Sequence, residues 1–209
     1  IVIADNGSTD GPLTIAHALA AEHPDVRVIA MPEKGRGRAL RRAWLESDAD
    51  ILTYMDVDLS TNLDAFPRLV GAIGEEGFDL AIGSRLMKGS VVRKRSFKRE
   101  VTSRSYNLII KATFFTRFSD AQCSFKAISR KAAHYLIPRV EDQSWFFDTE
   151  LLILAEKGGF RIKDVPVEWV DDPDSRVNVA KTARDDLKGL LRLRTGGLSR
   201  ALRDDPPSV

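Results

Sequence analysis

The apolar residues of this chain fall into short runs that alternate with longer stretches of helical spacing. Short runs between turn-forming residues are typical of buried strands, and apolar residues three and four apart are typical of helices that pack on a sheet. The runs predict strands at 1–4, 26–29, 51–55, 80–82, 125–128 and 162–169. The helical stretches fall at 13–21, 38–47, 64–75, 99–115, 148–157 and 180–194, with another helix starting at Arg130. This alternation predicts an α/β fold with a mostly parallel sheet flanked by helices.

The pattern also suggests how the chain is divided. We expect one α/β domain over 1–178, an amphipathic basic helical region over 179–203 and a disordered tail over 204–209. The chain opens directly on an apolar strand, whereas an open parallel sheet would normally have a further strand and helix upstream. We therefore expect the domain to be incomplete at its N-terminus.

Composition adds little to this picture, but it excludes some classes of protein. With 43% hydrophobic and 30% charged residues among 209, the chain has the composition of a folded globular protein and not of a disordered one. Its single cysteine, Cys123, excludes an internal disulfide and a cysteine metal cluster. No apolar run approaches the roughly 18 residues that a membrane-spanning helix needs.

Charge is unevenly distributed although the formal net charge is only +2. The segment 85–104 holds eight Lys and Arg residues and a single acid, Glu100. A basic block of this kind suits a phosphate, an anionic membrane surface or nucleic acid, and it also occurs as a solvated loop face. Phe97 is the only aromatic residue in its interior, so nucleic acid is the weakest of these partners.

Three polar segments follow predicted strands, where open α/β sheets bind ligands. The segments 5–11 and 33–39 combine glycines with polar or basic residues, which suits a nucleotide or an anion and equally a turn with helix-capping residues. The third segment carries Asp56 and Asp58, two carboxylates one residue apart at the end of an apolar strand. Because their mutual repulsion favours a counter-cation, this pair suits Mg²⁺ or Mn²⁺ held jointly with substrate phosphates, or else two solvated acids.

Seven segments in order carry a family resemblance. They read IVIADNGSTDG, PEKGRGRA, MDVDLST, IGSR, AQCSFKA, FFDTELL and VPVEWVDDPDSRV. Over 1–177 the chain resembles the family 2 glycosyltransferases of GT-A (Rossmann-like) fold, and within them the dolichyl-phosphate mannose synthase and polyprenyl-phosphate glucosyltransferase branch. The family usually begins with a strand and loop that this sequence does not show.

The resemblance implies a role for each matching residue. The nucleotide sugar would be bound by Asp5, Asn6, Arg36, Asp56 and Asp58. The metal, Mg²⁺ or Mn²⁺, would lie at Asp56, Asp58 and Ser60. The acceptor phosphate would be bound by Arg85, Arg99, Ser103, Ser175 and Arg176. Asp58, Arg85 and Asp148 would be the catalytic residues. Asp148 and Glu150 could each act as a base, position the sugar or acceptor, or serve only as structural residues at the start of a helix.

We therefore expect an inverting hexosyltransferase of the dolichyl-phosphate β-mannosyltransferase type. It would move mannose or glucose from GDP-mannose or UDP-glucose to a polyprenyl or dolichyl phosphate, as a peripheral protein at the cytoplasmic face of a membrane. A phosphate monoester is mostly deprotonated at neutral pH, so arginines rather than a base would dominate at the acceptor. Two alternatives stay open, a hydroxyl acceptor that needs a true base and an inactive nucleotide-sugar-binding module.

Overall fold

A four-stranded mixed sheet forms the centre of the protein. The computed structural model describes residues 1–171 and 179–203. The strand order is β3 (Ile51–Tyr54), β6 (Lys126–Ser129), β4 (Leu80–Ser84) and β7 (Ile162–Pro166). β6 runs antiparallel to both of its neighbours, and β4 and β7 are parallel. The α/β class predicted from the sequence is confirmed, with β6 as the strand that makes the sheet mixed.

Two further pairs of strands lie beside this sheet. β1 (Val2–Asn6) and β2 (Arg27–Met31) form a parallel pair of their own, and within the described residues they pair with no strand of the central sheet. β5 (Val91–Arg93) and β8 (Glu168–Val170) form the second parallel pair. The sequence pattern did not predict β5, and it joined β7 and β8 into one strand that the structure divides at Val167.

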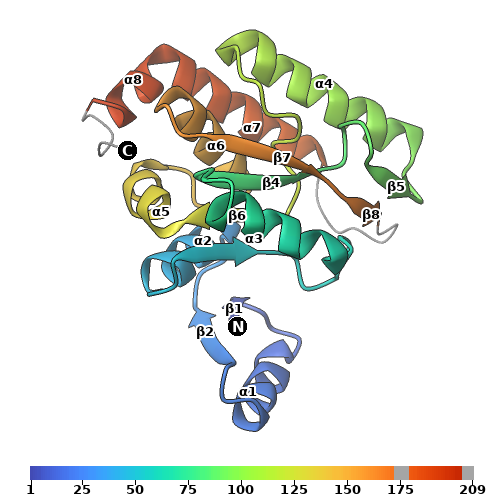
Figure 1. Ribbon diagram of the computed structural model, residues 1–209, viewed down its shortest axis with the longest axis vertical. Helices are drawn as coiled ribbons and strands as arrows, with labels where there is room; N and C mark the ends of the chain where they lie inside the picture. Colours follow the sequence, from blue (N-terminus) through green and yellow to red (C-terminus); the bar gives the residue numbers. More distant parts are fainter. Residues whose placement is uncertain (172–178, 204–209) are drawn as a thin grey trace.

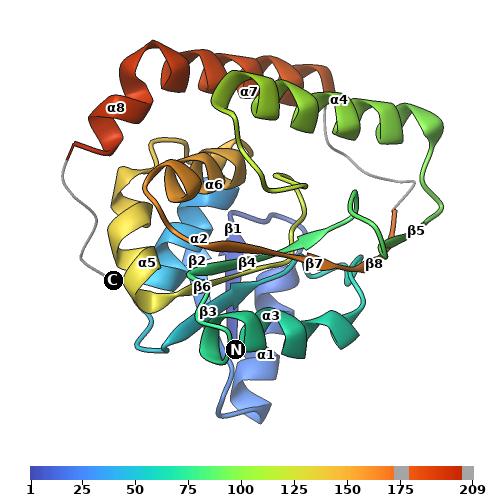
Figure 2. The same ribbon diagram turned by 45° about the horizontal axis from the view of Figure 1, so that its top comes forward.

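Helices cover both faces of the central sheet (Figures 1 and 2). α3 (Phe66–Gly74) lies on one face, and α4 (Phe97–Phe114), α6 (Phe147–Lys157) and α7 (Val179–Arg192) lie on the other. The remaining elements are α1 (Pro12–Glu22), α2 (Arg36–Leu45), η1 (Leu63–Ala65), α5 (Arg130–Leu136), η2 (Ile137–Arg139), η3 (Leu193–Gly197) and α8 (Leu198–Ala201).

The alternation of side chains along β4 produces two hydrophobic cores. Leu80 and Ile82 pack with residues of α4, α5 and α6, whereas Ala81 packs with Leu69 and Ala72 of α3. All five of these side chains are buried. Successive residues of a strand point to opposite faces, so one apolar strand supplies both layers.

Helix α4 begins and ends at residues suited to these positions. The hydroxyl of Ser96 accepts a hydrogen bond from the backbone N–H of Arg99 at 3.3 Å, which is an ordinary N-cap. The helix ends at Phe115, whose φ of +54° leaves the helical region. The N-cap at Ser96 places the basic residues 93–95 directly before the first turn of α4.

The C-terminal helix packs on the domain through a close contact. Leu190 of α7 and Leu193 lie in the same core as α6, and a Cβ on Gly189 would collide with the ring of Phe146. Only glycine therefore allows this approach. The tail at 204–209, for which we predicted disorder, lies outside the described residues.

Candidate functional site

The two acids that follow β3 line a shallow depression at the end of the central sheet. Asp56, Asp58 and Ser60 form its wall together with Trp169. The side chain of Asp56 is 42% exposed, and Asp58 accepts a hydrogen bond from the backbone N–H of Ser60 at 2.9 Å. Leu59 lies between them with a φ of +53°, a conformation uncommon for a branched residue. The structure thus brings the three predicted metal-site residues together in one depression.

The depression offers an open set of metal ligands. Within the described residues no group of three or more His, Cys, Asp or Glu side chains could enclose an ion. Mg²⁺ usually keeps several non-protein ligands and is bound by one or two carboxylates plus substrate phosphates. Asp56 and Asp58 fit an ion that arrives with a diphosphate.

Arg36, the first residue of α2, lies beside this depression. One of its terminal nitrogens lies 3.4 Å from Asp56 and donates to the hydroxyl of Tyr54 at 3.2 Å. Its guanidinium carbon lies 5.3 Å from the centre of the Trp145 ring. Burial alone would lower the pKa of Arg36, but Tyr54, Asp148 and Asp56 outweigh it and raise that pKa. Arg36 therefore presents a fixed positive charge beside Asp56.

Asp148 belongs to a buried network behind Arg36. Its carboxylate accepts a hydrogen bond from Tyr54, and the ammonium group of Lys126 lies 3.0 Å away. Both Asp148 and Lys126 are buried. Burial would raise the pKa of Asp148, but Lys126 and Arg36 lower it below the usual value for aspartate. Asp148 therefore stays ionised and is a weak base in this arrangement.

Lys126 and Tyr54 did not emerge as site residues from the sequence. The signal for Lys126 was present, because a lysine inside the apolar strand β6 is almost never buried without a partner. The partner itself, Asp148, lies 22 positions further along the chain at the start of α6. Sequence reasoning had no means to join the two.

Arg85 follows β4 and is held rigidly. Two of its nitrogens donate to the carboxylate of Asp120 at 2.8 and 2.9 Å, and its guanidinium stacks on Trp169 at 4.9 Å. Burial would raise the pKa of Asp120, but the charge and hydrogen bonds of Arg85 lower it. Such a bidentate pair fixes both the position and the plane of the guanidinium.

Arg99 and Ser103 lie in the first turns of α4, near Arg85. A nitrogen of Arg99 is 3.8 Å from Asp171, and the hydroxyl of Ser103 accepts a hydrogen bond from Arg95 at 2.5 Å. Arg95 approaches the same Asp171 at 3.9 Å. We call Arg85, Arg95 and Arg99 the arginine cluster. Ser175 and Arg176, for which we also predicted contact with the acceptor phosphate, lie outside the described residues.

Trp169 of β8 connects the acid pair with the arginine cluster. Trp169 lines the depression with Asp56 and Asp58, and the guanidinium of Arg85 stacks on its ring. Its indole N–H donates to Asp171 at 2.7 Å, the acid that pairs with Arg99. The structure thus brings the predicted metal site and the predicted acceptor residues to a single aromatic side chain.

Asp5 and Asn6 at the end of β1 have different contacts. Asp5 accepts a hydrogen bond from the backbone N–H of Ser8 at 3.3 Å, as a turn residue does. Asn6 accepts one from Gly35 at 2.7 Å and so ties the β1 loop to the loop before α2. That second loop begins α2 at Arg36. Asn6 therefore helps to position Arg36, whatever else it contacts.

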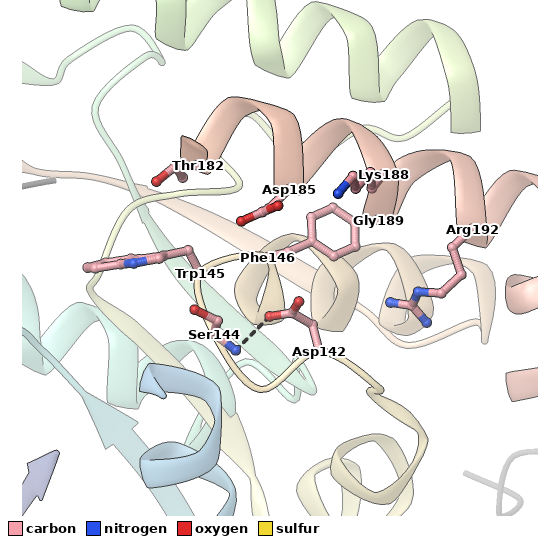
Figure 3. A pocket seen from close by; sticks show the side chains of 9 residues that line it. All are labelled: Asp142, Ser144, Trp145, Phe146, Thr182, Asp185, Lys188, Gly189 and Arg192. Atoms are coloured by element: carbon pink, nitrogen blue, oxygen red, sulfur yellow. Dashed lines mark hydrogen bonds between the residues drawn. The ribbon is translucent and has the colours of Figure 1, made fainter. Parts of the chain in front are cut away.

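A pocket of about 470 Å³ opens on the other side of Trp145 (Figure 3). It lies between the loop before α6 and α7. Its lining side chains include two acids, Asp142 and Asp185, and two cations, Lys188 and Arg192. Trp145 thus separates this pocket from Arg36.

Comparison with known proteins agrees with this arrangement. A sequence model of glycosyl transferase family 2 matches residues 1–136. The chain belongs to this family. It is 38% identical to glycosyltransferase AglD of Haloferax volcanii over 182 residues, which cover 87% of this chain and 29% of that protein.

Dolichyl-phosphate β-glucosyltransferases are also among its relatives. The chain is 29% identical to the Trichomonas vaginalis enzyme ALG5C, covering 86% of this chain and 55% of that one. It is 27% identical to the Saccharomyces cerevisiae enzyme, covering 98% and 67%. The chain thus spans less than two thirds of the length of the first two of these three relatives. The Trichomonas vaginalis and Saccharomyces cerevisiae enzymes are both named for glucose, whereas the sequence prediction included mannose.

The fold has a close counterpart among solved structures. Glucosyl-3-phosphoglycerate synthase of Mycobacterium tuberculosis, solved with Mn²⁺ and UDP-glucose, superposes with a TM-score of 0.66 at 19% identity. The match covers 93% of this chain and 67% of that one. It confirms the predicted GT-A type of fold.

Proposed function

We propose that this chain transfers glucose from UDP-glucose, in preference to mannose from GDP-mannose, to a polyprenyl or dolichyl phosphate, with inversion at the sugar carbon. The observation that carries the proposal is the position of Trp169 between the acid pair Asp56 and Asp58 and the arginine cluster. Donor and acceptor are both polyanions, so an enzyme that joins them has to neutralise each one separately and hold the two close together. The relatives named as dolichyl-phosphate glucosyltransferases favour glucose over mannose.

On the donor side, the proposal gives each residue a defined task. Asp56 and Asp58, with Ser60, would hold Mg²⁺ or Mn²⁺, which when bound stabilises the charge that develops on the leaving diphosphate. Arg36 lies 3.4 Å from Asp56 and would contact the same diphosphate. Asp5 would contact the nucleoside, and Asn6 would hold the loop that carries Arg36.

On the acceptor side, charge and not proton removal would control the reaction. Arg85 is oriented by Asp120, Arg99 lies 3.8 Å from Asp171, and Ser103 accepts a hydrogen bond from Arg95. A phosphate monoester loses its second proton near pH 6, so its attacking oxygen needs little assistance from a base. Asp148 would then act by positioning Arg36 and not as a proton acceptor, because Lys126 and Arg36 keep it ionised.

The partner surface on the acceptor side would be a membrane. Helix α4 has an apolar inner face, and it also exposes an outer row of apolar side chains: Phe97 is 83% exposed and Leu108 is 66% exposed. Val101 and Ile109 are exposed on the same helix. Exposed apolar rows mark interaction surfaces, and flanking cations such as Lys98 and Arg104 suit anionic lipid. Peripheral attachment at the cytoplasmic face is therefore part of the proposal. No helix of the described residues has the length and hydropathy to cross a bilayer.

The test is transfer from radiolabelled nucleotide sugars in detergent micelles. Asp58→Asn should lower turnover on a polyprenyl phosphate about 100-fold or more, while the exposed Asp48→Asn should leave it unchanged. The same assay compares a polyprenyl phosphate with the matching alcohol, and Mg²⁺ with Mn²⁺ and with chelator. Equal activity of Asp58→Asn, or transfer to the alcohol as fast as to the phosphate, would contradict the proposal.

A hydroxyl acceptor is the second candidate, and the same variants separate it. A hydroxyl needs a base at the transition state, and among the described residues Asp148 is the candidate that the motif FFDTELL supplies. Asp148→Asn would then abolish turnover without changing affinity for the nucleotide. For a phosphate acceptor, the same change should weaken nucleotide-sugar affinity through Arg36 and leave part of the turnover.

A further inference from the structure

The side chain of Arg95 is buried and incompletely bonded. It is only 6% exposed. One terminal nitrogen donates to the hydroxyl of Ser103 at 2.5 Å and approaches the carbonyl of Arg99 at 3.5 Å. The other terminal nitrogen and Nε have no hydrogen-bond partner within 1–171 and 179–203, although Nε lies 3.0 Å from a carboxylate oxygen of Glu100. Buried N–H groups ordinarily have partners, so these two call for an explanation.

The acids around Arg95 are shared with other cations. Asp120 accepts three hydrogen bonds from Arg85 and a further one from the backbone N–H of Gln122. Glu100 also pairs with Arg104 at 2.5 Å. Burial and the neighbouring charge of Arg85 lower the pKa of Arg95, which is the direction expected for a cation short of negative partners.

The remaining acid near Arg95 is itself only partly bonded. One oxygen of Asp171 accepts the indole N–H of Trp169, and the other has no hydrogen-bond partner among the described residues. That acid is 3.9 Å from Arg95 and 3.8 Å from Arg99, too far for a hydrogen bond. The cluster therefore combines an arginine with two nitrogens that have no hydrogen-bond partner among the described residues and an acid that does not reach it.

We propose that Arg95 binds the phosphate group of the acceptor together with Arg85, Arg99 and Ser103. This rests on the proposed function and adds to its acceptor site a residue that the sequence motifs did not single out. The hydroxyl of Ser103 holds one end of the guanidinium of Arg95. A phosphate monoester dianion supplies the acceptor oxygens that this guanidinium lacks, and the planar fork of arginine fits them two at a time.

The backbone before α4 explains why Arg95 points into the arginine cluster while Arg93 and Lys94 do not. Lys94 has a φ of +57° and is exposed, and Arg93 pairs on the surface with Glu168 at 2.8 Å. The turn at Lys94 and the N-cap at Ser96 place Arg95 at the base of α4, facing Ser103. Of three consecutive cations, only Arg95 points inward.

The experiment measures acceptor and donor affinity separately. We choose Arg95→Gln, Arg95→Lys and, as the matched control for loss of one charge, Lys94→Gln. A short, soluble prenyl phosphate serves as acceptor, so that membrane contact plays no part. Its binding is followed by calorimetry without donor, and its KM and kcat are followed with saturating UDP-glucose.

We expect Arg95→Gln to weaken prenyl phosphate binding about 10- to 100-fold, since a hydrogen-bonded charge pair is lost. The KM for UDP-glucose and the kcat at saturating acceptor should change less than about threefold. Arg95→Lys should recover only part of the loss, because an ammonium group does not form the bidentate contact. The melting temperature should not fall, because glutamine removes a buried charge that carries two nitrogens without a hydrogen-bond partner among the described residues.

Two results would overturn the inference. If Arg95→Gln and Lys94→Gln bind prenyl phosphate equally while the wild type prefers the phosphate to the alcohol, the proposed function stands and the role of Arg95 is wrong. If Arg95→Gln lowers the melting temperature and weakens donor and acceptor alike, the residue is structural. A wild type that binds prenyl phosphate and prenyl alcohol equally would instead refute the proposed function itself.

Discussion

Replacing Asp148 by asparagine should destabilise the protein strongly, for a reason that is independent of catalysis. Its carboxylate lies 3.0 Å from the ammonium of Lys126 and 3.7 Å from the guanidinium of Arg36, and all three side chains are largely or fully buried. Asparagine has nearly the same shape, but it removes the carboxylate that pairs with Lys126 and leaves Arg36 with Asp56 alone. Breaking a buried pair in this way costs about 3–5 kcal/mol. We expect Asp148→Asn to lower the free energy of unfolding by an amount in that range.

A second substitution tests whether charge balance is the cause. In Lys126→Met/Asp148→Asn, one buried cation is removed together with the carboxylate. The double variant should be more stable than the sum of the two single losses predicts, by about 1–3 kcal/mol. Urea unfolding followed by far-UV circular dichroism measures all four proteins. A loss below about 1 kcal/mol in Asp148→Asn, or strict additivity in the cycle, would refute this account.

The pH dependence provides an independent check. The pKa of Asp148 is lower in the folded protein than its unfolded value of about 3.9. A depressed pKa contributes stability that is present above the unfolded pKa and is lost as the pH falls through the folded one. The difference in stability between wild type and Asp148→Asn should therefore be constant from pH 5 to 7 and should shrink below about pH 4.

Three further predictions follow from other contacts. Gly37→Ala should cost about 1–3 kcal/mol in thermal unfolding, because its Cβ would lie 2.6 Å from the ring of Phe147, and a normal melting temperature would contradict this. Asp120→Asn should raise the KM for the lipid phosphate at least about 10-fold and leave the KM for UDP-glucose unchanged, because it frees Arg85 from its bidentate partner. The pKa of Asp186 is raised to about 7 by burial, so its neutral form is favoured and stability should fall as the pH rises from about 4 to 7. Asp186→Asn should reduce that fall in urea unfolding, and an unchanged pH profile would show that Asp186 is not its source.

The sequence was sufficient for the fold class, because hydrophobic periodicity is a local property. Six of the predicted helices match observed ones to within a few residues, and the pair Asp56 and Asp58 does lie at the end of a strand. Periodicity does not reveal direction, however, and β6 runs antiparallel to both neighbours. Nor did it show the break at Val167, since Val165, Val167 and Trp169 continue the apolar alternation across it.

Only the tertiary structure decided which charges meet. Lys126 with Asp148, and Arg85 with Asp120, are each separated by tens of residues, and no local pattern favours one partner over another. Burial removes these groups from water, and each then requires a counter-charge within a few ångströms, which only the packing of distant strands and helices supplies. The position of Trp169 between the acid pair and the arginine cluster arises in the same way. The sequence pattern determines the local secondary structure of this chain. The electrostatics of its candidate site depend on contacts that form only when distant strands and helices pack together.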